Sequence, residues 1–156
     1  MKLMILAVGR LRSGPEAAMV ADYIARFKKT GRVLGFSDLT LVEIDERKAL
    51  SKDAQAKLLL AAIPVGSVIW ACDENGEQPK SEGFARNIQA LADTGTGVLA
   101  IVIGGADGLG PAVLDRAQNK ISFGRMVWPH MLVRVMLTEQ LYRAASILAG
   151  LPYHRA

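Results

Sequence analysis

The sequence predicts an α/β fold in which a mostly parallel sheet carries helices on both faces. Two observations support this prediction. Short runs of Val, Ile and Leu alternate along the whole chain with segments whose apolar residues recur at helical spacing. The runs are apolar at successive positions, which is typical of parallel strands buried on both faces. The chain has no internal repeat and no break in composition, so we expect a single domain over residues 1–156.

The elements follow from local signals. Pro15 and Pro111 are each expected to open a helix, Ser51 and Ser81 are each expected to cap one, and Gly150 is expected to end the last. The predicted strands cover residues 3–8, 39–44, 68–72, 98–103 and, as a shorter candidate, 121–123. The predicted helices cover residues 15–29, 52–62, 81–93, about 111–119, and 132–149.

The helix over residues 132–149 is apolar around most of its circumference. A helix of this kind must be buried on most sides. In a chain of this size, a second subunit is a reasonable source of part of that cover. We therefore expect a homodimer that forms through this helix.

Composition narrows the classes of protein. The single cysteine, Cys72, excludes a disulfide within the chain and a cysteine-based metal cluster, and it indicates a reducing, cytoplasmic compartment. The two histidines have no partners at metal-ligand spacing, so we expect no metal. No stretch approaches the ~20 apolar residues of a membrane span, so we expect no membrane association. The N-terminal apolar run lacks a cleavage site and is predicted to be a buried strand rather than a signal peptide.

Positive charge is concentrated in the C-terminal quarter. Residues 1–115 contain 13 Lys or Arg and 14 Asp or Glu, whereas residues 116–156 contain six and one, which gives net charges of −1 and +5. Such a patch suits a phosphate backbone. A solvated basic face accounts for the charge alone equally well.

A glycine-rich segment over residues 104–111 follows the fourth predicted strand. It matches neither the G-x-G-x-x-G nor the Walker pattern, and the chain has no G-x-S-x-G motif. Glycines just past a buried strand let a ligand approach the backbone, and ligands of open α/β sheets bind at the carboxyl ends of the strands. The alternative is a tight turn without a ligand.

Two further segments are candidates for binding. Residues 123–130 place Phe, Met, Val and Trp in one loop, which can wrap an adenine or simply cover the core. The tail, residues 152–155, combines an aromatic ring, an imidazole and a guanidinium, which can stack on a base and contact phosphate. A frayed end is the alternative for the tail.

Together these segments resemble one family, the RlmH family of SPOUT methyltransferases. The resemblance rests on the residues at 103–109, 128–135, 139–144 and 152–155, and the opening residues 1–3 and 7–9 also match, so it spans essentially the whole chain. It implies methylation of N3 of a pseudouridine in 23S rRNA, on the assembled 70S ribosome, with S-adenosylmethionine (SAM) as methyl donor. It also implies a C-terminal trefoil knot and a homodimer whose partner subunit helps to complete the catalytic pocket.

The resemblance also implies a SAM-binding set. At two positions of this set the chain departs from the family pattern: the family often has Leu where this chain has Cys72, and it commonly has an apolar residue where this chain has Arg125. A third lies beside it, since residues 104–108 read Gly-Gly-Ala-Asp-Gly where the family often has Gly-Gly-Pro-Glu-Gly. The set consists of Cys72, Gly104, Phe123, Gly124, Arg125, Met126, Val127 and Trp128.

Methylation at N3 requires that a proton be removed from the ring, because the N3 imide is protonated near neutral pH and is then a poor nucleophile. His130 is the favoured base or orienter because it flanks the SAM loop, with a helix-capping role as the alternative. Tyr153 and His154 are further candidates. Arg155 and Arg143 are assigned to phosphate or base contacts, although Arg143 is also spaced for an i, i+4 ion pair with Glu139 on a helix surface.

Three other functions compete with this one. The first is a non-catalytic RNA-binding protein of the same fold, which would not bind SAM. The second is a SPOUT methyltransferase with another target, such as a tRNA position; the tail at 152–155 argues against it, because the tail matches the RlmH family in particular. The third is a flavodoxin-like domain that binds flavin or a nucleotide.

Overall fold

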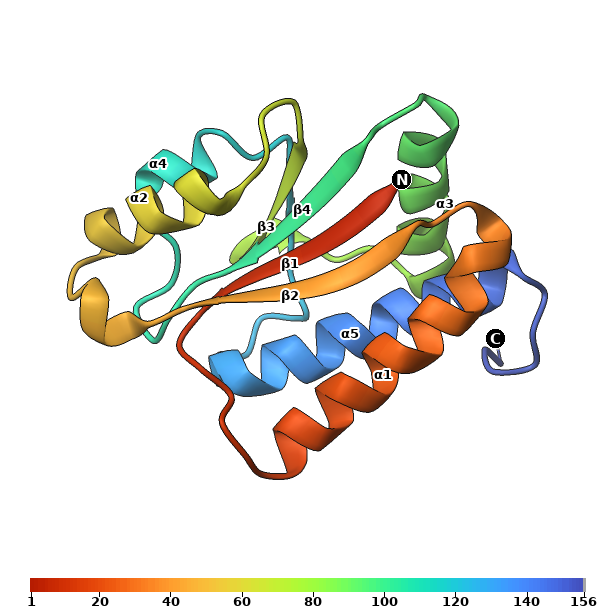
Figure 1. Cartoon of the computed structure of the whole chain (residues 1–156), viewed down its shortest axis with the longest axis horizontal. Coiled ribbons are helices and arrows are strands. Elements are labelled where there is room, and N and C mark those ends of the chain that lie inside the picture. The colour runs from red at the N-terminus through yellow and green to blue at the C-terminus, as the bar shows by residue number, and fades with distance from the viewer. Residues whose placement is uncertain (156) are drawn as a thin grey trace.

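The computed structural model describes residues 1–155. Its five strands form one sheet in the order β2-β1-β4-β3-β5, and every pairing between neighbours is parallel (Figure 1). No helix in these residues has the length and apolar character that a membrane span requires. The strands are β1 (Lys2–Val8), β2 (Asp38–Ile44), β3 (Val68–Glu77), β4 (Val98–Ile103) and β5 (Asn119–Ile121).

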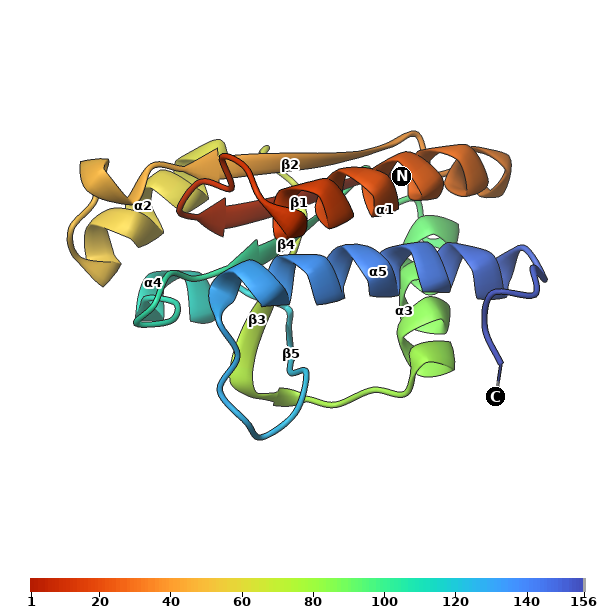
Figure 2. The same ribbon diagram turned by 90° about the horizontal axis from the view of Figure 1, so that it is seen from below.

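The helices cover both faces of the sheet, as expected. Helices α1, α3 and α5 pack on one face, and α2 and α4 pack on the other (Figure 2). They are α1 (Pro15–Gly31), α2 (Lys52–Ala62), α3 (Ser81–Asp93), α4 (Pro111–Leu114) and α5 (His130–Leu148), with short 3-10 turns η1 (Arg32–Leu34) and η2 (Glu46–Lys48).

The core has two layers because successive side chains of a strand point to opposite faces. In β1, Leu3 and Ile5 pack beneath α1, α3 and α5, whereas Leu6 and Val8 pack beneath α2 and α4. These side chains are almost completely buried. The apolar runs of the sequence are therefore central strands covered on both sides.

Most of the apolar surface of helix α5 is buried by other elements of the same chain. Leu137 and Leu141 are fully buried against the sheet and the neighbouring helices, and α1 runs alongside α5 over much of its length (Figures 1 and 2). At its first turn, Met131 and Leu132 stay about 40% exposed. The apolar circumference of α5 thus does not by itself require a second subunit, and the homodimer stays a prediction.

Three sequence-based predictions need correction. The helix that Pro111 opens ends at Leu114 instead of about residue 119. It stops early because Gln118 turns toward β3, where its side-chain oxygen accepts a hydrogen bond from the Ile69 amide at 2.6 Å. The fifth strand consequently lies at Asn119–Ile121 rather than at 121–123.

The third correction concerns Ser81. It is the first residue of α3 rather than its cap, and its hydroxyl donates to Gln140 Oε1 of α5 at 2.9 Å. Tertiary contact has therefore overridden a local capping signal. The trefoil knot that the resemblance implies stays a prediction.

Candidate active site

A cavity of about 510 Å³ lies at the carboxyl ends of the central strands. Its wall combines the end of β3, the glycine-rich segment after β4 and the segment after β5. Ligands of open parallel sheets bind at this edge. Of the residues assigned to SAM, those that line it are Cys72, Gly104, Phe123, Gly124, Met126, Val127 and Trp128. The exposed Arg125 is not part of this lining.

The glycine-rich segment folds back on itself directly after β4. The amide of Gly108 donates to the carbonyl of Gly105 at 3.0 Å, and Gly108 has a φ of +80°. A Cβ at Gly104 would overlap the backbone of Gly108. Only glycine therefore fits at position 104, and the tight turn keeps bare backbone at the cavity wall.

The segment after β5 presents apolar side chains that the chain itself does not bury. Met126 and Val127 are 69% and 84% exposed, and Trp128 is 37% exposed. A loop that only covered the core would bury these groups. Their exposure favours the binding of a ligand or a partner over the core-covering alternative.

Cys72 lies at the point where β3 meets β4 and β5, opposite Ile103 and Ile121. Burial raises the pKa of its thiol to about 12. The thiol is therefore neutral at physiological pH and serves as a small apolar group of the cavity wall rather than as a nucleophile.

His130 is the first residue of α5 and lines the same cavity. The residue at the N-cap position is Pro129, and no side chain caps the helix, so the structure does not support a capping role for His130. Burial lowers the pKa of His130 below its ordinary value of 6.5, and the positive charge of Arg134 lowers it further, while Glu46 opposes both. The imidazole is thus neutral at neutral pH and can accept a proton.

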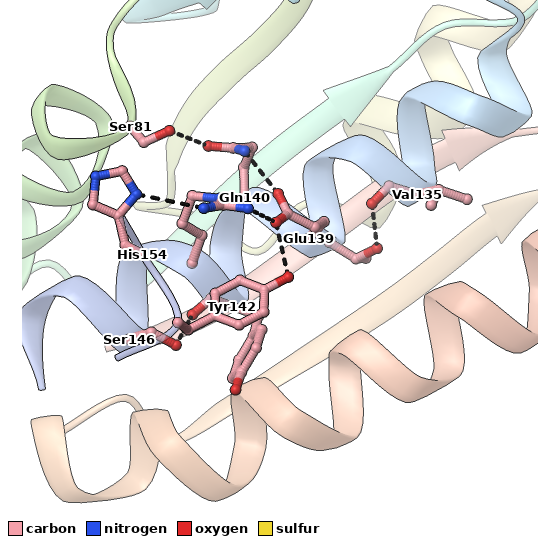
Figure 3. A network of polar contacts seen from close by, with 10 residues as sticks. Ser81, Val135, Glu139, Gln140, Tyr142, Ser146 and His154 are labelled. Atoms are coloured by element: carbon pink, nitrogen blue, oxygen red, sulfur yellow. Dashed lines mark hydrogen bonds and ion pairs between the residues drawn. The ribbon is translucent and has the colours of Figure 1, made fainter. Parts of the chain in front are cut away.

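The C-terminal tail folds onto α5 and α3 instead of fraying. The hydroxyl of Tyr153 donates to Glu139 Oε1 at 3.0 Å, and His154 Nε2 lies 2.8 Å from Glu82 Oε1. Arg143 pairs with Glu139, and its guanidinium lies 4.9 Å from the centre of the Tyr153 ring. Figure 3 shows Glu139 and Gln140 of α5 in this network, with Ser81 and His154 beside them. The i, i+4 pair considered as an alternative role for Arg143 is therefore formed.

Tyr153 is poorly suited to act as a base. Burial raises the pKa of its phenol, and hydrogen bonds with Tyr23 and Glu139 raise it further. The phenol therefore stays protonated at neutral pH and acts as a donor. Arg155, beside it, is exposed.

The tail cluster and His130 do not meet within one chain. Arg143 follows His130 by 13 positions of one continuous helix, which corresponds to about 20 Å at ~1.5 Å per residue. Tyr153 and His154 contact Arg143 and α3 at that far end. The predicted catalytic residues thus form two separate groups in the monomer.

The basic patch of the C-terminal quarter is smaller than the sequence suggests. Arg134 is fully buried and pairs with Glu43 of β2, and Arg143 pairs with Glu139. The four remaining cationic side chains are exposed: Arg116, Lys120, Arg125 and Arg155. Arg134 contributes to the net charge of +5 in the C-terminal quarter, although an arginine inside the apolar run at 131–137 signals a buried and paired group.

Comparison with known proteins places this fold and cavity in a class. The family model described as "Predicted SPOUT methyltransferase" matches residues 1–154, and the chain therefore belongs to this family of methyltransferases. A probable methyltransferase from Bordetella pertussis Tohama I shares the fold, with a TM-score of 0.51 and 16% identity over 92% of this chain and 95% of that one.

Two relatives are much more similar in sequence. The chain is 54% identical over 155 residues to ribosomal RNA large subunit methyltransferase H of Ruegeria pomeroyi, with 99% of each chain covered. It is 56% identical over 155 residues to the protein of the same name from Cereibacter sphaeroides, again with 99% of each covered. The resemblance recognised from the C-terminal motifs is thereby confirmed.

Proposed function

We propose that this protein transfers a methyl group from SAM to N3 of a pseudouridine in 23S rRNA, and that its substrate is the assembled 70S ribosome. The observation that carries the proposal is the cavity at the carboxyl ends of the strands, in a chain of the SPOUT methyltransferase family. Its wall includes Gly104, Phe123, Gly124 and residues 126–128. The names of the two similar relatives support large-subunit rRNA as the target.

The cavity suits SAM in size and chemistry. Its volume lies within the range of about 300–1,000 Å³ that is usual for small-molecule sites. Met126, Val127 and Trp128 offer apolar surface for an adenine, and the carboxylates of Asp73 and Asp107 line a site for a ligand that carries a sulfonium and an ammonium group. When bound there, SAM supplies a methyl group activated by its positive sulfur.

The chain's own residues position the acceptor and manage its proton. Most of the rate gain comes from holding the attacking nitrogen in line with the methyl group. His130, neutral and at the cavity wall, would accept the N3 proton, so that N3 could take the methyl group as the S–CH₃ bond broke and the neutral thioether left. If it instead orients the ring, the neutral imidazole is still the form required.

The tail belongs to the site of the partner subunit in this proposal. The ~20 Å between His130 and Arg143 along α5 separates the two groups in one chain. A homodimer that brings the tail of one subunit to the cavity of the other would unite them. Tyr153 and Arg155 would then contact the target base and its phosphates from across the interface.

Transfer of labelled methyl groups from SAM tests the proposal. Ribosomes that lack the mark are offered as whole 70S particles, as 50S subunits and as naked rRNA. We expect label in large-subunit rRNA, mostly with 70S particles, because the four exposed cations of the C-terminal quarter form too small a basic patch to hold naked RNA tightly. No label with any of the three, together with no SAM binding by calorimetry, would contradict it.

A further inference from the structure

Arg134 is a charged side chain in the core, and both ends of its guanidinium are held. Its side chain is fully buried. Nη1 donates to Glu43 Oε1 at 2.9 Å, and Nη2 donates to the carbonyl of Val8 at the end of β1. The same oxygen of Glu43 also accepts the amide of Leu11 at 2.8 Å. One arginine of α5 thus ties together the carboxyl ends of β1 and β2.

Stability alone explains this arrangement poorly. Replacing a buried ion pair by well-packed apolar groups is often neutral or stabilising. The neighbours of Arg134 on α5, Val133 and Val135, are apolar, and Nε of Arg134 has no hydrogen-bond acceptor among residues 1–155. A buried charge with an unsatisfied atom is better explained by a role in the candidate site than by a contribution to stability.

The anchored guanidinium meets His130 at Gly9. A Cβ placed on Gly9 would lie 3.3 Å from His130 Nε2, 3.4 Å from Arg134 Nη2 and 3.3 Å from Glu46 Oε2. Gly9 has a φ of +86°, a backbone conformation that favours glycine, and the absence of a side chain there leaves room for these three groups. His130 and Arg134 are also four residues apart on α5, where side chains are neighbours.

We propose that Arg134 is a positioning residue that pins the first turn of α5 to the ends of β1 and β2 and so holds the His130 imidazole at the cavity wall. Its catalytic consequence rests on the proposed function, in which His130 is the base or orienter. The charged groups that face this cluster are Glu46 of η2 and Glu43 of β2, with Lys52, Asp73 and Asp107 around the cavity.

The imidazole itself provides the first test, without any need for activity. The chain has two histidines, so His154→Gln assigns the two signals in an NMR titration. Arg134→Met removes the positive charge, and we expect the pKa of His130 to rise. Glu46→Gln removes the opposing charge of an exposed residue, and we expect that pKa to fall. An unmoved His130 titration in Arg134→Met overturns the proposal, and should that variant fail to fold, an unmoved titration in Glu43→Gln, which alters the partner of the Arg134 guanidinium, does so.

Turnover provides the second test, with a matched pair on β2. Glu43→Gln weakens the anchor, whereas Asp38→Asn breaks an exposed ion pair with Lys28 at the opposite end of the same strand. We expect Glu43→Gln to lower kcat by about 10- to 100-fold through misplacement of His130, with the KM for SAM nearly unchanged. Asp38→Asn should behave as the wild type.

Equal kcat values for Glu43→Gln and Asp38→Asn, with an unmoved His130 titration, would show that Arg134 positions nothing. If the titration responds but kcat does not, the anchoring stands and the catalytic role of His130 in the proposed function fails. The two failures are therefore distinguishable.

Discussion

In the proposed function, His130 works as a neutral imidazole because of where the chain places it. Its ring lies at the end of β1, where burial and the charge of Arg134 both disfavour protonation. A histidine on a surface helix would be partly charged near its ordinary pKa and less able to accept a proton. At the residue scale, the site therefore depends on the surroundings of one ring as much as on the ring itself.

This placement predicts the acid limb of the pH–rate profile. Activity requires the neutral form, so it is lost as pH falls through the pKa of His130 in the folded protein, which lies below 6.5. The unfolded chain takes up that proton at higher pH, so folding stability from this group also declines as pH drops below 6.5. Measured kcat/KM against pH, which reports the free enzyme, should show a midpoint below 6.5. The variant His130→Ala should lower kcat far more than SAM affinity. A midpoint at or above 6.5, or full turnover in His130→Ala, would contradict the assignment.

Gly104 gives a second residue-scale prediction. An added Cβ would overlap the backbone of Gly108, so Gly104→Ala must displace the loop at the cavity wall. We expect SAM affinity measured by calorimetry to fall by at least about tenfold, or about 1.4 kcal/mol. Gly97→Ala is the matched control, because a Cβ at Gly97 meets nothing within 4 Å. Equal affinities in the two variants would remove Gly104 from the site.

At the element scale, the sequence indicated the strands well and some helix ends poorly. The runs that became β1 and β4 are apolar at almost every position, and Val98–Ile103 was predicted with its observed bounds. Strand β3, in contrast, continues to Glu77, five residues past its predicted end at Cys72. Local patterns could not show that Gln118 bonds to Ile69 and ends α4 early, or that Ser81 bonds to Gln140. Both are contacts between residues that are distant along the chain.

The residues of the candidate site likewise fall into those that the sequence predicted and those that it could not. Motif resemblance pointed to the residues of the cavity wall, which the fold brings together. It could not reveal the pairing of Arg134 with Glu43, because these residues lie 91 positions apart. Nor could it show that the tail cluster lies at the opposite end of α5 from His130.

Packing of α5 predicts a contrast between two leucines of this helix. Leu141 is fully buried between the sheet and the other helices, whereas Leu132 is 39% exposed. We expect Leu141→Ala to lower the free energy of unfolding by about 2–5 kcal/mol through cavity formation. Leu132→Ala should cost clearly less, because its methyl groups are already partly in water. Thermal unfolding of both variants checks this, and similar losses would contradict the packing described for α5.

At the scale of the whole molecule, the proposed function requires that two distant groups of residues be brought to one base. His130 and the SAM cavity lie at the start of α5, and the tail lies beyond its end. The exposed apolar side chains Met126 and Val127 line the cavity and leave surface for a partner, and Met131 is exposed in the first turn of α5. A homodimer with crossed tails is the simplest assembly that joins the two groups.

Mixed dimers test the crossed arrangement. His130→Ala and Arg155→Ala are each expected to be inactive alone, since each dimer then lacks one group at both sites. When both variants are co-expressed, half of randomly assembled dimers are mixed and hold one complete site, so activity should recover to about a quarter of the wild-type value. No recovery, or a monomer mass by light scattering at micromolar concentration, would mean that the tail does not act across a dimer.

The most direct test of the central claim is nucleoside analysis of the product. Large-subunit rRNA from unmodified 70S ribosomes, treated with the protein and SAM, is digested and examined by mass spectrometry. The proposed function predicts one new N3-methylpseudouridine per particle, strongly reduced with His130→Ala. A methyl group on any other base, or no new methylated nucleoside while SAM is bound, would contradict it.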